Sequence, residues 1–156
     1  MIKNQLIYFD NFFKRQFALV SMASRFMIGV FLDSLKTIGK EDLNKSSEFY
    51  FLTTRKGGKT ARTPTNGNII LTPQKEYSAY DEKFSLYSEF IEFKEDEEKS
   101  LVIEVHLKED DPLIDDKVAT RKIQLDCPTS TKKVTLNSEN GETKAELTIF
   151  ARNTKL

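Results

Sequence analysis

Apolar and polar side chains alternate with a period of two over most of the chain after Arg25. The longest apolar run, Phe26 to Leu32, differs in that it is apolar at both sets of positions, which is typical of a central strand buried on both faces. Shorter alternating runs follow it. The pattern predicts eight strands, at about 26–32, 48–54, 59–63, 84–90, 101–107, 118–125, 134–136 and 145–149.

Turn signals separate these runs. Gly57-Gly58 and Asn140-Gly141 are hairpin signals, and Asn66-Gly67 lies in a turn-rich stretch that holds a short apolar piece at 69–71. The acidic run Glu95–Glu98 predicts a solvated loop. Many short strands, regular turns and little helix indicate an all-β, antiparallel sandwich over residues 26–156.

Residues 1–25 follow a different period. Apolar side chains recur there at steps of three and four, which predicts an amphipathic helix. The segment carries four basic residues against one acidic residue. Two interpretations remain open, a docking helix or a mitochondrial targeting sequence. The stripe that would make the contact contains Ile2, Leu6, Phe9, Phe13 and Phe17.

Composition narrows the classes of function. The chain has 156 residues and equal numbers of basic and acidic residues, 24 each, which argues against a dedicated nucleic-acid-binding protein. Its single cysteine, Cys127, excludes an internal disulfide framework. The longest apolar run is much shorter than the roughly 20 residues of a membrane-spanning helix. We therefore expect a soluble or peripheral protein.

Several segments, taken in order, resemble a C2 domain of the permuted, type II-like topology. The opening strand and a polar loop precede Ser47-Glu48-Phe49-Tyr50, which is similar to the acidic and aromatic strand start of that family. Tyr80 to Phe84 matches a later aromatic and acidic segment, and 101–123 follows the pattern of strand, acidic loop and strand. The resemblance covers about residues 26–151. It implies an eight-stranded C2-like β-sandwich.

The resemblance also implies where a calcium site would lie. C2 domains hold calcium with carboxylates from two loops at one end of the sandwich. The matching positions here form a degenerate set, in which a lysine replaces one carboxylate: Asp42, Glu48, Lys108, Asp110 and Asp116. An ammonium group there repels a cation, and it would pair with Asp42 or Asp110 instead. The alternatives are residual calcium binding, and acidic residues that only line a solvated rim.

A basic hairpin offers a second candidate surface. Four cationic residues surround the Gly57-Gly58 turn, namely Arg55, Lys56, Lys59 and Arg62. C2 domains often use basic strands in this region for anionic lipid headgroups, and each such residue adds about 1 kcal/mol of attraction to an acidic membrane. The alternatives are an acidic partner protein and charges that stay in water.

Signals for an enzyme are weak. The only histidine, His106, lies on the polar side of a predicted strand, and nothing near it or Cys127 supports a catalytic arrangement. Gly57-Gly58-Lys59-Thr60 lacks the earlier glycine of a phosphate-binding loop and is interpreted as a turn. We predict no catalytic residue, no cofactor and no metal.

These observations predict a non-catalytic, calcium-independent docking or scaffold subunit of a larger, membrane-associated assembly. Its partners would be the protein subunits of that complex, with anionic lipid headgroups as a further candidate and no nucleic acid. The basic N-terminal segment suggests the mitochondrial inner membrane, peripherally bound, as an accessory subunit of a respiratory-chain complex. The alternative location is cytoplasmic or ciliary, and the alternative function is a stand-alone calcium-dependent phospholipid-binding module.

Overall fold

A computed structural model describes residues 23–38, 46–72, 75–78, 84–110 and 116–154. The described residues form ten strands packed as two antiparallel sheets, and no helix. The strands are β1 (Ala23–Thr37), β2 (Ser47–Arg55), β3 (Thr60–Thr63), β4 (Ile69–Leu71), β5 (Glu76–Ser78), β6 (Phe84–Lys94), β7 (Ser100–Glu109), β8 (Asp116–Asp126), β9 (Thr129–Asn137) and β10 (Thr143–Asn153).

The predicted all-β sandwich is confirmed. The sequence predicted eight strands, and two three-residue strands, β4 and β5, account for the larger number. The predicted N-terminal helix lies outside the described residues, except that β1 begins at Ala23, three residues before the expected boundary. Strand pairing explains this start, because Ser24 and Arg25 pair with Phe93 and Glu92 of β6.

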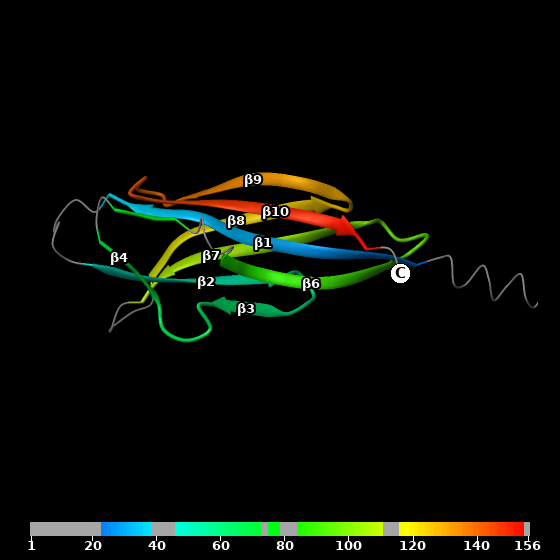
Figure 1. Cartoon of the computed structure of the whole chain (residues 1–156), viewed down its shortest axis with the longest axis horizontal. Helices are drawn as coiled ribbons and strands as arrows, with labels where there is room; N and C mark the ends of the chain where they lie inside the picture. The colour runs from blue at the N-terminus through cyan, green and yellow to red at the C-terminus, as the bar shows by residue number, and fades with distance from the viewer. Residues whose placement is uncertain (1–22, 39–45, 73–74, 79–83, 111–115, 155–156) are drawn as a thin grey trace, which may run out of the picture.

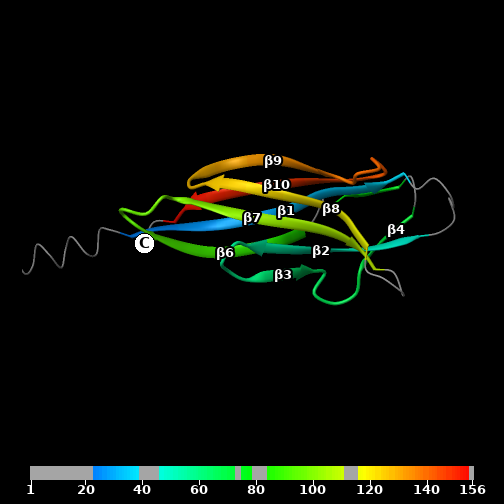
Figure 2. The ribbon, with the colours of Figure 1, turned by 180° about the vertical axis from the view of Figure 1, so that it is seen from behind.

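The first sheet is built around β1, the predicted central strand. Its two edges pair with β10 on one side and with β6 and then β5 on the other, and β9 follows β10. The second sheet has the order β3-β2-β7-β8, and β4 also pairs with β2. The two sheets lie face to face (Figures 1 and 2).

The core lies between the two sheets. Alternate residues of β1 (Phe26, Ile28, Val30 and Leu32) are fully or almost fully buried, and so are Ile103, Val105 and Leu107 of β7 opposite them. This is the period of two seen in the sequence. The predicted turns at Gly57-Gly58 and Asn140-Gly141 are present. Gly57 and Gly141 have φ of +75° and +72°, a region that glycine enters without a side-chain penalty.

The strand order leaves two long sides where the sheets meet by their edges. On one side β3 and β6 lie beside each other, and on the other β8 and β9 do so (Figure 2). Strands β1 and β7 end, and β2 and β8 begin, at the same end of the sandwich (Figure 1). The candidate functional residues fall on these three places and on the outer face of the first sheet.

Candidate functional site

Four of the predicted calcium-loop positions, Glu48, Lys108, Asp110 and Asp116, lie at the end of the sandwich where β2 begins and β7 ends. The backbone amide of Asp110 donates to the carbonyl oxygen of Glu48 at 2.8 Å, so the two residues are adjacent. Asp116 is the first residue of β8. Asp42 lies outside the described residues. Among the residues that the structure describes, no group of three or more His, Cys, Asp or Glu is arranged to hold a metal ion.

An asparagine joins the two carboxylates that meet there. The side-chain amide of Asn68 donates to Glu48 Oε2 at 3.0 Å and to Asp110 Oδ2 at 2.6 Å. Its carbonyl oxygen accepts a hydrogen bond from Arg62 Nη2 at 2.9 Å. A guanidinium therefore polarises the amide that binds both acids. Sequence reasoning assigned Asn68 no role, because it follows Asn66-Gly67 in a stretch interpreted only as a turn.

Arg62 is fixed by three further contacts. It donates to the carbonyl oxygens of Pro64 at 2.5 Å and Gly67 at 2.8 Å, and its guanidinium carbon lies 4.3 Å from the centre of the Tyr50 ring. These contacts hold the 64–68 turn against β3. We refer to Arg62, Asn68, Glu48 and Asp110 as the loop-end network.

Lys108 does not belong to the loop-end network. It is half-buried in β7, next to a bulge, and pairs across the sheet with Tyr50 and Lys117. Within the described residues Asp110 is bound by Asn68, and no ion pair joins it to Lys108. Pairing of Lys108 with Asp42 stays a prediction.

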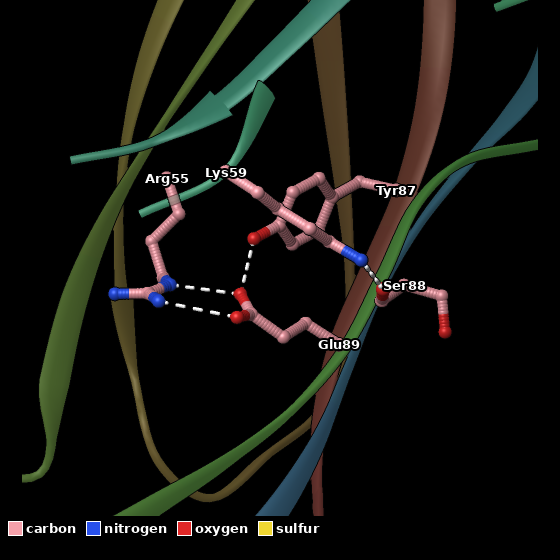
Figure 3. Close-up of polar contacts among 5 residues, drawn as sticks. All are labelled: Arg55, Lys59, Tyr87, Ser88 and Glu89. Atoms are coloured by element: carbon pink, nitrogen blue, oxygen red, sulfur yellow. Dashed lines mark hydrogen bonds and ion pairs between the residues drawn. The ribbon is translucent and has the colours of Figure 1, made fainter. Parts of the chain in front are cut away.

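The basic hairpin makes contacts that the sequence did not indicate. Arg55 forms a two-pronged ion pair with Glu89 of β6, with Nε at 2.8 Å from Oε2 and Nη2 at 3.1 Å from Oε1 (Figure 3). The hydroxyl of Tyr87 donates to the same Oε2. The hydrogen bond from Arg55 lowers the pKa of Glu89, and burial together with the bond to Glu89 raises the pKa of Tyr87 to about 12.

Two other side chains of the hairpin reach the exposed edge of β6. Lys59 Nζ donates to the carbonyl oxygen of Ser88 at 2.8 Å, and Thr63 Oγ1 donates to that of Leu86 at 3.3 Å (Figure 3 shows the first). These bonds cover edge carbonyl groups that would otherwise be open to another strand. We call Arg55, Lys59, Thr63, Tyr87 and Glu89 the clasp, because they join the two sheets along this side.

The clasp changes the interpretation of the basic hairpin. Of the four cations that the sequence assigned to a lipid or an acidic partner, Arg55, Lys59 and Arg62 are engaged within the chain. Lys56 is exposed, and among the described residues its side chain makes no hydrogen bond or ion pair. A headgroup at this hairpin would therefore have to compete with internal hydrogen bonds, and lipid binding there stays a prediction.

An aromatic surface lies on the outer face of the first sheet. Phe31 and Phe150 stack with ring centres 5.6 Å apart, and Arg152 lies 4.5 Å above Phe150. Arg25 lies 4.5 Å above Phe90, whose exposed fraction is 53%. Met27 pairs with both Phe90 and Arg152, so it connects the two clusters. We call these residues the aromatic face: Arg25, Met27, Phe31, Phe90, Phe150 and Arg152.

A glycine permits the close packing of the aromatic face. A Cβ on Gly29 would lie 2.4 Å from the Phe150 ring, so the ring occupies the space above the glycine backbone. The sequence indicated this face only indirectly, through the two-sided apolar run of β1. The N-terminal docking residues Ile2, Leu6, Phe9, Phe13 and Phe17 lie outside the described residues, and β1 begins at the border of the aromatic face.

The contacts of His106 and the burial of Cys127 show how the fold places the two residues considered for catalysis. His106 Nδ1 lies 2.8 Å from Thr120 Oγ1 and Nε2 lies 2.5 Å from Glu104 Oε1, all on the outer face of the second sheet. Cys127 is buried, which together with Asp126 raises its thiol pKa and disfavours the reactive thiolate. Within the described part of the chain there is no helix able to span a bilayer.

Comparison with solved structures identifies the fold. A C2 domain of plant Extended Synaptotagmin 1 has a TM-score of 0.51 and 13% identity over 83% of this chain and 96% of that domain. A C2 domain protein from Ramazzottius varieornatus has a TM-score of 0.50 and 14% identity, over 86% of this chain and 92% of that one. The predicted C2-domain fold is therefore confirmed.

A further match is to an enzyme, and it covers only a small part of that enzyme. Human GIVD cytosolic phospholipase A2 has a TM-score of 0.52 and 16% identity over 86% of this chain, which spans 17% of that protein. No protein-family model matches the chain, and no curated protein sequence is significantly similar to it. At these identities the likeness shows the fold, and function rests on the side chains.

Proposed function

We propose that this chain is a non-catalytic docking module that works without calcium inside a larger, membrane-associated assembly. The loop-end network is the observation that carries this proposal. At the end of the sandwich where carboxylates would converge on calcium, Glu48 and Asp110 already share the amide of Asn68. That amide is in turn bound by Arg62.

The physical argument concerns repulsion between carboxylates. Two carboxylates brought together repel each other, and in a calcium site the metal removes that repulsion. Here the Asn68 amide donates to both, and the charge of Arg62 strengthens the amide as a donor. The loop end is therefore assembled by the chain itself, and calcium has less to contribute.

The docking surface that we propose is the aromatic face, and its occupant is a protein surface with an apolar centre and carboxylates around it. Aromatic side chains, methionine and arginine are the residues enriched at protein interfaces and at their energetic centres. The guanidinium carbons of Arg25 and Arg152 each lie 4.5 Å from the centre of a phenylalanine ring, and a guanidinium held against a ring keeps its planar donors available for paired hydrogen bonds with carboxylates.

A calcium titration tests the first half of the proposal. We expect the unfolding temperature of the full chain to stay unchanged up to about 1 mM calcium, the weak end of protein calcium sites. A rise of several degrees that disappears in Asp110→Asn would contradict calcium independence. It would favour the second candidate function, a calcium-dependent phospholipid-binding module. That candidate gains support from the adjacency of Glu48 and Asp110.

A matched pair of exposed apolar residues tests the docking surface. Phe90 is 53% exposed on the aromatic face, and Ile70 is 66% exposed at the loop end. The native size of the endogenous protein after mild detergent extraction should exceed 18.0 kDa greatly. We expect Phe90→Ser to release the chain from its complex and Ile70→Ser to leave it bound. Release by Ile70→Ser alone would indicate insertion of the loop end into a membrane instead.

For the location, we propose a peripheral site on the mitochondrial inner membrane, as an accessory subunit of a respiratory-chain complex. The support is the basic, amphipathic character of residues 1–25. Mass spectrometry of the proteins that migrate with the chain tests this directly. A chain found only in cytosolic or ciliary fractions would contradict it.

A further inference from the structure

A basic groove separates the two edge strands on the side of the sandwich opposite the clasp. It lies between β8 and β9, which run beside each other in Figure 2, and it encloses about 350 Å³. Four cationic side chains line it, Arg121 and Lys122 from β8 and Lys132 and Lys133 from β9, and no carboxylate does. Because the whole chain has no net charge, this concentration of one sign is local.

Two of these cations occupy positions that alternation reserves for the core. Residues paired across antiparallel strands point to the same face of a sheet. Arg121 pairs with Val105 and Lys132 pairs with Ile149, and both apolar partners are fully buried between the sheets. Arg121 and Lys132 are nevertheless exposed, because they open into the groove.

The four cations differ in their partners. Lys133 Nζ lies 2.8 Å from Asp33 Oδ2, and Lys122 Nζ lies 3.8 Å from Glu104 Oε2. Within the described residues no hydrogen bond or ion pair is made by the side chains of Arg121 and Lys132. The inner part of the groove therefore carries two unneutralised charges, with two partly neutralised charges at its rim.

From this arrangement we propose that the groove binds a compact anion with two or more phosphate groups, held chiefly by Arg121 and Lys132. The planar guanidinium of Arg121 matches two phosphate oxygens at once, and Lys132 supplies a point charge. The volume lies at the lower end of the range for small-molecule sites, which favours a small anion over a protein segment. Four cationic side chains around so small a volume match a ligand whose negative charges lie close together, as those of clustered phosphates do.

Calorimetric titration of the full chain with inositol hexakisphosphate tests the proposal. We expect saturable binding that weakens as salt is raised, and an affinity at least about tenfold lower in the double variant Arg121→Gln/Lys132→Gln. Arg121→Lys keeps the charge but loses the two-pronged geometry, so its loss should be smaller than that of the double variant. Circular dichroism confirms that each variant is folded.

The control removes two charges elsewhere. Lys94 and Lys117 are exposed, and no side-chain hydrogen bond or ion pair of either is seen in the described residues. Lys94→Gln/Lys117→Gln should therefore bind as the unaltered chain does. Equal weakening in the two double variants, or no binding by the unaltered chain, would overturn the proposal.

A second arm separates a free anion from a lipid headgroup. Vesicles of phosphatidylcholine with phosphatidylinositol 4,5-bisphosphate are compared with the soluble probe. Loss of vesicle binding in Arg121→Gln/Lys132→Gln supports the groove as a headgroup site, whereas loss with the soluble probe alone supports a free anion. This site is independent of the aromatic face and of calcium, so its failure leaves the proposed docking function untouched.

Discussion

The two long sides of the sandwich carry similar numbers of cations and use them in opposite ways. On the clasp side Arg55 is bound to Glu89 through two hydrogen bonds, and Lys59 covers the carbonyl oxygen of Ser88. On the groove side Arg121 of β8 and Lys132 of β9 line the same groove, and no described residue neutralises their charges. One side uses its cations to join the sheets, and the other leaves them open to a ligand.

A single carboxylate accounts for much of this difference. Glu89 pairs with Ile28 and so lies on the inner face of the first sheet, where Arg55 of the second sheet reaches it. No carboxylate lines the groove between β8 and β9. A cation at a strand edge therefore stabilises the fold when the other sheet places a carboxylate opposite it. Where the other sheet places none, the cation remains available to a ligand.

The largest expected effect is on the clasp side. Arg55→Ala leaves Glu89 partly buried without its two charged hydrogen bonds, which should lower the free energy of unfolding by about 1–3 kcal/mol. Arg121→Ala removes the same side chain from the groove side, where it has no partner among the described residues, and should change stability by less than about 0.5 kcal/mol. Urea unfolding of both variants measures the contrast directly.

Equal losses from the two substitutions would break the comparison. A Glu89→Gln variant serves as the control for shape, since it keeps one of the two acceptor oxygens and removes the charge. Its free energy of unfolding should lie between that of the unaltered chain and that of Arg55→Ala.

The second prediction uses pH. Because Arg55 lowers the folded-state pKa of Glu89 below its ordinary value of 4.5, ionised Glu89 stabilises the fold above that value. This contribution is lost as pH falls through the lower folded-state pKa. Below pH 4.5 the unaltered chain should therefore lose stability more steeply than Glu89→Gln, measured by urea unfolding in steps of pH. Identical acid profiles would show that the ion pair contributes nothing.

Sequence alternation predicted the architecture well for a definite physical reason. A strand with one buried face must alternate, so β7 and β10 were visible in the chain, and β1 was visible as a run that is apolar on both faces. The glycine turns at Gly57 and Gly141 were visible too. The short strands β4 and β5 were missed or underrated because three residues cannot show a period. Arg121 and Lys132 were missed because each stands at a core position of its strand, and only the fold shows that these two positions open into a groove.

The candidate site was harder to predict, because its contacts join segments distant in the chain. Arg55 and Glu89 are 34 residues apart, and Asn68 and Asp110 are 42 apart. The sequence grouped Arg55, Lys56, Lys59 and Arg62 by adjacency, whereas the fold sends Arg55 to β6 and Arg62 to the loop end. Only the register between sheets decides which cation meets which carboxylate.

The smallest expected effect sharpens the comparison through salt. Unneutralised Arg121 and Lys132 repel each other, so Arg121→Gln/Lys132→Gln should stabilise the chain slightly at low salt, by about 0.3 kcal/mol. The Debye screening length falls from about 30 Å at 0.01 M to about 3 Å at 1 M salt, and the gain in stability should vanish over that range. Thermal unfolding across the salt series measures it, with Lys75→Gln/Lys94→Gln as the matched removal of two exposed charges that have no charged residue paired opposite them in the described part of the chain. If the groove variant is instead destabilised at low salt, its two cations are already neutralised within the chain. The two sides of the sandwich would then differ only in the identity of their partners.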